Sequence, residues 1–271
     1  MELRVNGSRI LATTGGREPN ADLPLLLFIH AAALDRTAWQ LQTRYFSHHG
    51  YSVLAVDLPQ HGGSQGTAPD SIEGYADWVA ELIAAAGYET AHIVGHSMGA
   101  LIALETAARH PNVVSTLILC GAASALPVHR DLLAAAESGD HLAYELMTSW
   151  GLGRVSHRGG HPTPGLWMVG STIRLWERAR PGVLANDLHA CNNYSHGPEA
   201  ASQIKVPTLM ITGSIDVMAP PAAAGPLRDR IADLEEVVID GAGHIMMFEQ
   251  PDPFIDAVAG FLARREGLAA R

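Results

Sequence analysis

Residues 91–99 read AHIVGHSMG and join a short apolar run to a Gly-x-Ser-x-Gly pattern and then to a helical pattern. Residues 91–94 predict a buried strand, and residues 98–109 predict a helix that stops before a proline. Gly95 and Gly99 allow the helix and strand to approach closely, so the turn holds Ser97 in a strained conformation at the positive end of the helix dipole. A serine on such a strand–turn–helix unit is typical of a nucleophile. The alternative is a tight turn with an incidental serine.

Strands and helices alternate on both sides of this turn. The apolar runs at residues 25–29 and 114–119 are of the kind buried on both faces of a parallel sheet. Strands that alternate with helices imply right-handed crossovers, so we predict an α/β fold with a mostly parallel sheet flanked by helices. The other expected elements are strands at 53–56, 207–212 and 236–239, helices at 37–49, 71–86, 222–231 and 253–265, and an N-terminal hairpin of residues 2–5 and 8–12 around Asn6-Gly7.

The alternation stops between residues 125 and 204. This stretch contains a loop rich in Gly, His and Pro at residues 151–165 and has no convincing apolar strand. It reads most simply as a helical insertion of about 80 residues into one larger domain. We therefore predict a core domain at residues 1–124 and 205–271 and a helical cap at residues 125–204. The helical patterns of the cap cover residues 131–138, 141–150 and 167–178.

The composition argues against several classes of function. Asp and Glu outnumber Lys and Arg by 28 to 18, a formal net charge of −10, which disfavours nucleic acids and anionic membranes as partners. Lys205, the sole lysine, has no glycine-rich loop beside it, which argues against a phosphate-binding P-loop and a Schiff-base lysine. Residues 1–5 alternate like a strand rather than a secretory leader, and residues 23–34 are too few to span a bilayer. We expect a cytoplasmic protein, whose oligomeric state the sequence does not indicate.

A serine hydroxyl needs a neighbouring base, and fourteen histidines compete for this role. His244 lies in the loop after the last predicted strand, at the sheet edge where open α/β sheets collect their active-site residues. The glycines before it would let the imidazole reach toward Ser97. We predict His244 as the general base; the alternative is a structural histidine.

A carboxylate that orients the base is expected after another strand. Asp216 follows the strand predicted at residues 207–212, whereas the loop after residues 114–119 contains no carboxylate. Asp240 lies so close to His244 in the sequence that it would have to fold back to reach the imidazole. Asp216 is therefore the predicted orienting acid.

The combined pattern resembles the α/β-hydrolase family, in particular small bacterial esterases, from Leu25 to about Arg265 without most of the insertion. The chain order Ser97, Asp216, His244 is that of this family. The resemblance implies that the backbone N–H groups of Ala32 and Met98 form an oxyanion hole, and that the insertion closes over Ser97. The matching stretches are FIHAAA at residues 28–33, DLPQHGGS at 57–64, the Ser97 turn, GSID at 213–216, and Gly243-His244 followed by EQP at 249–251.

Two positions depart from the family pattern. The usual His-Gly before the oxyanion loop is His30-Ala31 here, which loses the backbone freedom of glycine. The usual glycine of Asp-x-Pro-Gly-x-Gly is Gln60, in a turn that we interpret as structural.

These residues predict a serine hydrolase that cleaves a small or medium, partly apolar carboxylic ester through an acyl-enzyme, with no metal or organic cofactor. A serine at position 97 argues against dehalogenases and epoxide hydrolases, which by family resemblance use aspartate there. Carbon–carbon bond hydrolases, lactonases and thioesterases use the same triad, and a non-catalytic ligand-binding protein is a further alternative. Candidate pocket residues are His30, Trp150 and Trp167, with Met147, Met168 and Trp176 also available, although the aromatic and Met side chains of the insertion could equally form its own core.

Overall fold

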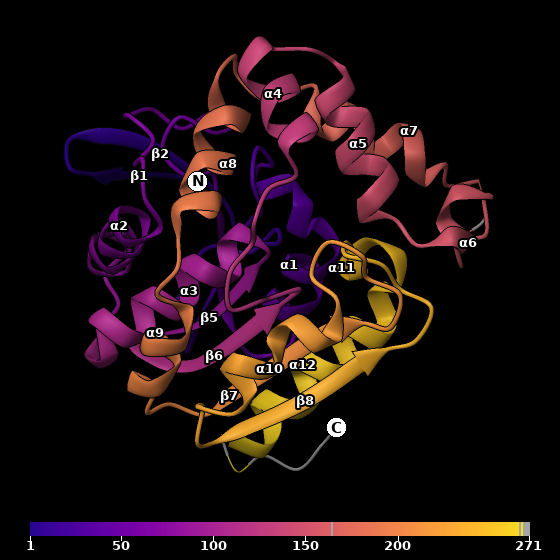
Figure 1. Ribbon diagram of the computed structural model, residues 1–271. Coiled ribbons are helices and arrows are strands. Elements are labelled where there is room, and N and C mark those ends of the chain that lie inside the picture. Colours follow the sequence, from indigo (N-terminus) through magenta and orange to yellow (C-terminus); the bar gives the residue numbers. More distant parts are fainter. Residues whose placement is uncertain (164, 266, 268–271) are drawn as a thin grey trace.

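The computed structural model describes residues 1–163, 165–265 and 267, so residue 164 of the predicted cap and residues 266 and 268–271 of the predicted core lie outside the described part. Its eight strands form one sheet in the order β1-β2-β4-β3-β5-β6-β7-β8 (Figure 1). Strands β3 to β8 pair in parallel, and the N-terminal hairpin of β1 and β2 joins them antiparallel. The predicted mostly parallel sheet is confirmed. The strands are β1 (Glu2–Val5), β2 (Ser8–Thr13), β3 (Leu25–Ile29), β4 (Ser52–Val56), β5 (Ala91–His96), β6 (Val114–Cys120), β7 (Thr208–Gly213) and β8 (Leu234–Ile239).

Helices cover both faces of this sheet. The crossover from β3 to β4 runs in the opposite direction along the sheet to those from β4 to β5 and from β5 to β6. Crossovers of this kind are right-handed, which places α1 on one face and α2 and α3 on the other, and α2 and α3 contact each other. Helix α12 packs beside α1. Together the two layers bury the central strands, which read as continuous apolar runs. These helices are α1 (Gln40–Ser47), α2 (Ile72–Ala85), α3 (Met98–Arg109) and α12 (Pro251–Arg265).

The described residues between β6 and β7 form six helices and no strand. The sequence pattern predicted α4, α5 and α7 but not α6, α8 and α9. Helices α4, α5 and α7 extend beyond the carboxyl ends of the strands, and α9 lies beside α3 of the core (Figure 1). The division into core and cap remains our proposal. The bounds are α4 (Arg130–Ser138), α5 (Leu142–Gly151), α6 (Arg154–His157), α7 (Met168–Trp176), α8 (Val183–Asn193) and α9 (Gly197–Gln203).

After β7 the chain forms two short helices, α10 (Gly225–Arg228) before β8 and α11 (Met246–Glu249) after it. Among the described residues, no helix has the length and apolar character needed to cross a bilayer. The parallel strands all end at the same edge, so the loops after β3, β5, β7 and β8 meet there. The candidate site lies at this edge.

Candidate active site

Ser97 occupies the sharp turn between β5 and α3. Its φ of 55° and ψ of −118° lie in a region that non-glycine residues rarely adopt, and such strain persists only where the surroundings fix it. The Ser97 amide donates to the Cys120 carbonyl oxygen at 2.9 Å, and the Ser97 carbonyl accepts from the Ala100 amide at 2.8 Å. The turn therefore presents the half-buried hydroxyl at the first turn of α3.

The two glycines of the motif are required by close backbone contacts. A Cβ atom on Gly95 would lie 2.1 Å from the Gly99 carbonyl oxygen, and one on Gly99 would lie 2.4 Å from the Ile29 carbonyl oxygen. Both neighbours are backbone atoms, so neither can move aside without shifting a strand or helix. The glycines therefore fix how closely α3 approaches the sheet.

We expect Gly95→Ala to lower the free energy of unfolding by about 3 kcal/mol, at the upper end for overpacked cores. The matched control is Gly260→Ala in α12, where an added Cβ would meet only the flexible end of Arg264 at 3.3 Å. That change should be neutral or stabilise by up to about 1 kcal/mol through helix propensity. Urea unfolding of both variants measures the difference. Equal stability of the two variants would contradict this account of the elbow.

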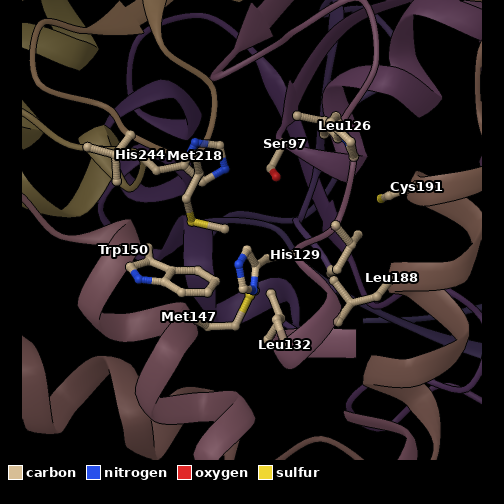
Figure 2. Close-up of a pocket in the computed structure, with 14 residues that line it drawn as sticks. Ser97, Leu126, His129, Leu132, Met147, Trp150, Leu188, Cys191, Met218 and His244 are labelled. Atoms are coloured by element: carbon tan, nitrogen blue, oxygen red, sulfur yellow. The ribbon is translucent and has the colours of Figure 1, made fainter. Parts of the chain in front are cut away.

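His244 lies in the loop after β8 and points to the same cavity as Ser97. Both residues line that cavity, and Figure 2 draws both side chains at its wall. The His244 Nδ1 atom donates to Asp216 Oδ2 at 2.8 Å, and the His244 amide donates to the Gly151 carbonyl at 2.8 Å. The buried Nε2 atom has no hydrogen-bond partner in the described part of the chain. It is therefore free to act on a group that enters the cavity.

Asp216 is buried and fully used as an acceptor. Its Oδ1 atom accepts from the amides of Met218 at 2.8 Å and Ala219 at 2.9 Å, while Oδ2 accepts from His244. Burial, the largest influence, raises the pKa of this carboxyl, but the charge of His244 and the three hydrogen bonds outweigh it and hold the pKa below its usual value. The exposed Asp240 instead accepts from the Ser214 hydroxyl at 3.1 Å. Asp216, not Asp240, is thus the ionised partner of His244.

Two further buried side chains, His96 and Glu249, fix the His244 loop; both lie within longer motifs quoted from the sequence, but neither was given a role there. His96 Nε2 donates to the His244 carbonyl at 2.7 Å, and burial lowers the pKa of His96 to about 3, so its ring stays neutral beside His244. Glu249 accepts from the Gly243 amide at 2.8 Å and from the Gly153 amide at 2.7 Å. The signal for His96 was its place inside the Gly-x-Ser-x-Gly motif.

The loop after β3 brings Ala32 to the wall of the cavity that Ser97 also lines. Within the described residues neither Ala32 N–H nor Met98 N–H donates to a protein acceptor, so both remain available for an oxyanion. The expectation that His30 lines the pocket is wrong. His30 is fully buried beneath the loop, where Nδ1 donates to the Ala31 carbonyl at 2.8 Å and Nε2 accepts from the Leu58 amide at 3.1 Å. Its two ring nitrogens are used to hold the backbone.

The cavity has a volume of about 330 Å³ and mostly apolar walls (Figure 2). Trp150 and Met147 of α5 line it, whereas Met168 and Trp176 are buried elsewhere. For Trp167 both earlier interpretations, pocket wall and cap core, are wrong. Its side chain is 66% exposed, and its ring covers Gly170 on the outside of α7. The residues that line the cavity are Ala32, Ser97, Leu126, Pro127, Val128, His129, Leu132, Met147, Trp150, Leu188, Cys191, Val217, Met218 and His244.

Several of these cavity residues were missed by the sequence analysis. Residues 126–129 and 217–218 lie in irregular segments, where no periodicity marks a side chain as facing inward. Leu188 and Cys191 belong to α8, which was not predicted as a helix. The one signal available was position, since both irregular segments follow strands that end at the edge that carries Ser97.

Comparison with known proteins gives consistent matches over most of the chain. A sequence model described as the alpha/beta hydrolase family matches residues 26–257. The (E)-2-((N-methylformamido)methylene)succinate hydrolase of Acinetobacter baylyi is 25% identical over 88% of this chain and 89% of its own length. A pimeloyl-[acyl-carrier protein] methyl ester esterase of Neisseria meningitidis is 30% identical over 80% of this chain and 71% of its own length.

Solved structures of two enzymes superpose over nearly the whole chain. The enol-lactonase from Burkholderia xenovorans LB400 aligns with a TM-score of 0.86 and 25% identity, covering 97% of this chain and 100% of the enzyme. A thermophilic esterase aligns with a TM-score of 0.80 and 27% identity, covering 98% and 97% of the two chains.

Proposed function

The chain belongs to the alpha/beta hydrolase family of enzymes, and from this premise we propose that it is a serine hydrolase that cleaves carboxylic esters of uncharged, partly apolar small molecules through an acyl-enzyme. The observation that carries the proposal is that Ser97 and His244 line the same apolar cavity, while His244 Nδ1 donates to the buried Asp216 carboxylate. The relatives named as esterases support the reaction class but do not identify a substrate.

The geometry supports a defined role for each residue. Because Nδ1 of His244 donates to an ionised carboxylate, its Nε2 carries the lone pair that can take the proton of Ser97. The hydroxyl oxygen of Ser97 attacks the carbonyl carbon, and the oxyanion forms beside the amides of Ala32 and Met98. Each such donor typically contributes about 3 kcal/mol to the transition state. Protonated His244 then gives its proton to the leaving alcohol.

The second half of the reaction uses the same groups in reverse. His244 takes a proton from water, the resulting hydroxide attacks the acyl carbon, and the Ser97 oxygen leaves with a proton from His244. The low pKa of Asp216 keeps its negative charge in place throughout, which stabilises the imidazolium in both steps. Every proton is thus moved by one imidazole, so these steps need no metal or organic cofactor.

The walls of the cavity favour an uncharged substrate. No Asp, Glu, Lys or Arg side chain is found among the described residues that line it. An acyl group that ends in a carboxylate would find no Arg or Lys partner among these residues, only the imidazoles of His129 and the catalytic His244, and its loss of hydration costs several kcal/mol. The name of the Acinetobacter relative specifies a succinate derivative, whose carboxylates would need such partners. We therefore extend the reaction class of the relatives to this chain, but not that substrate.

A lactone is the second candidate substrate, because the enol-lactonase has the same fold over its whole length. A lactone is an internal ester and would be opened by the same steps. No feature of the described residues favours a thioester or a carbon–carbon bond, and the complete set of catalytic groups argues against a purely binding function. The cytoplasmic location and the absence of nucleic-acid and membrane partners remain predictions.

The substrate class is tested with p-nitrophenyl esters of increasing acyl length. We expect kcat/KM to be highest for uncharged chains of medium length, and about 100-fold lower for a chain of equal length that ends in a carboxylate. An uncharged lactone series measured beside them separates the two candidate substrates. A charged chain that is cleaved as fast as its uncharged counterpart would contradict the proposal.

Widening the cavity should shift this length preference. Trp150→Ala is expected to raise kcat/KM for the longest chains about 10-fold relative to acetate, since a cavity wall acts on binding rather than on the reacting atoms. Trp167→Ala is the matched control, because that side chain is exposed and does not line the cavity. The control should keep the wild-type profile. A shift of equal size in both variants would remove Trp150 from the substrate site.

A further inference from the structure

A buried carboxylate on cap helix α8 contacts the oxyanion loop of the core. Asp187 is fully buried, and its Oδ2 atom accepts from the Ala33 amide at 2.8 Å. The same oxygen contacts His61 Nε2 at 2.7 Å, and Oδ1 accepts from the Tyr75 hydroxyl at 2.9 Å. The carboxylate thus joins the cap to three separate segments of the core.

The charge of Asp187 is balanced by His61. Burial is the largest influence on both groups and opposes the charged forms, but the attraction and hydrogen bond between them outweigh it. The pKa of His61 is raised and the pKa of Asp187 is lowered. The neighbouring His30 ring, 4.9 Å from the His61 ring, stays neutral because burial, together with the charge of His61, lowers its pKa to about 4. An ion pair therefore fixes the carboxylate beneath the loop.

A second cap helix contacts the other end of the same peptide unit. Trp176 of α7 donates from Nε1 to the Ala32 carbonyl oxygen at 3.2 Å. The Ala32 carbonyl and the Ala33 N–H belong to one peptide plane and point in opposite directions. Trp176 and Asp187 therefore fix that plane from both of its polar ends, and the amide aimed at the oxyanion belongs to the preceding plane.

This peptide needs an external restraint. Ala33 has a φ of +55°, which costs energy for a residue with a side chain and persists only where contacts over-determine it. The loop contains three alanines and no glycine, so its turn is not favoured by backbone freedom. The hydrogen bonds from Asp187 and Trp176 therefore hold Ala33 in a conformation that the loop residues do not favour by themselves.

We propose that Asp187 and Trp176 are positioning residues that hold the Ala32 amide in place for the oxyanion, so that the cap controls turnover as well as substrate entry. The inference rests on the proposed function. A donor displaced by about 1 Å stabilises the oxyanion poorly but still permits substrate to bind. Loss of the restraint should therefore lower kcat and leave KM nearly unchanged.

The test compares Asp187→Ala with Asn186→Ala. Asn186 is the adjacent residue of α8 and also joins the cap to the core, through a 2.9 Å hydrogen bond to the Pro69 carbonyl. Its side chain also contacts Tyr75, but no hydrogen bond of the described residues joins it to the loop at residues 31–34. With the preferred p-nitrophenyl ester, Asp187→Ala should lower kcat about 10- to 100-fold with KM within about threefold. The inhibition constant of a trifluoromethyl ketone, which forms an oxyanion adduct on Ser97, should rise by the same factor. Asn186→Ala should change neither value more than about twofold.

Hydrogen–deuterium exchange gives a readout independent of catalysis. The peptide that contains residues 31–34 should exchange about 10-fold faster in Asp187→Ala than in Asn186→Ala. An inactive wild-type protein would overturn the proposed function. Even then, the difference in exchange rate between the two variants would decide whether the cap restrains the loop. Equal exchange and equal kcat in the two variants would overturn the inference.

Trp176→Phe decides the matter if Asp187→Ala does not fold. This variant keeps the ring in the cap and removes only the donor to Ala32, so kcat should fall about fivefold with KM unchanged. Asp187→Asn keeps an oxygen that can accept from Ala33 and should restore most of the turnover lost in Asp187→Ala. A Trp176→Phe enzyme with wild-type kcat and wild-type ketone affinity would overturn the proposal.

Discussion

Replacing Ser97 by alanine is expected to lower kcat/KM for an activated short-chain ester at least 10⁴-fold. The change removes the attacking oxygen, and the amides of Ala32 and Met98 can then stabilise only a slow attack by water. A fluorophosphonate probe should label the wild-type protein on Ser97 and leave the variant unlabelled. Activity is measured with p-nitrophenyl butyrate, and labelling by mass spectrometry of the intact chain and its peptides.

The control for this variant is the integrity of the fold. Alanine adopts a positive φ about as poorly as serine, so the free energy of unfolding should change by less than about 1 kcal/mol. A folded Ser97→Ala protein that keeps more than about a tenth of the wild-type activity would remove Ser97 from the proposed mechanism.

The second large effect is expected for Asp216→Asn. An amide cannot accept from His244 Nδ1 through its NH₂ group and favours the other imidazole tautomer, which leaves Nε2 protonated and unable to act as base. We expect kcat to fall about 10⁴-fold at neutral pH, as for an asparagine in this position of a serine protease triad. KM should change little, because Asp216 does not line the cavity.

Asp240→Asn is the matched control for the acid. It makes the same chemical change at the neighbouring strand end, but Asp240 is exposed and contacts Ser214 rather than His244. Its activity should stay within about twofold of the wild type. The reverse outcome, an active Asp216→Asn protein and an inactive Asp240→Asn protein, would assign the orienting role to the other strand.

The fold could be predicted where local signals agreed with one another. Helix α3 has the bounds predicted from the sequence because a glycine turn precedes it and a proline follows it. Helix α8 was missed because its inward face carries Asp187, so the apolar periodicity is interrupted by a charge that is buried with its partners. In the sequence alone, a charged residue that is buried in an ion pair cannot be told from one on the solvated surface.

In the candidate site, the catalytic residues could be predicted from the sequence and the pocket residues could not. The carboxyl ends of parallel strands lie at one edge of the sheet, and Ser97, Asp216 and His244 each follow a predicted strand, so the sequence predicted that they lie at the same edge. The residues that line the pocket could not be predicted, because the helical pattern does not indicate whether a tryptophan side chain faces the cavity or the solvent. Trp150 faces the cavity and Trp167 faces solvent, although both were equally plausible from the sequence.

The topology of the insertion also bears on how such enzymes diverge. The chain leaves the sheet after β6 and returns at β7, and these strands are neighbours, so one whole segment can be exchanged for another without altering strand order. The contacts of Asp187 and Trp176 with the Ala32–Ala33 peptide make this exchange conditional. The proposed role of Asp187 and Trp176 predicts that a chimera with another segment in place of residues 125–204 is active only if the new helices again supply an acceptor and a donor at those two points. The path of the chain thus allows the segment between β6 and β7 to be exchanged. Whether a new segment supports catalysis depends on its hydrogen bonds to the Ala32–Ala33 peptide.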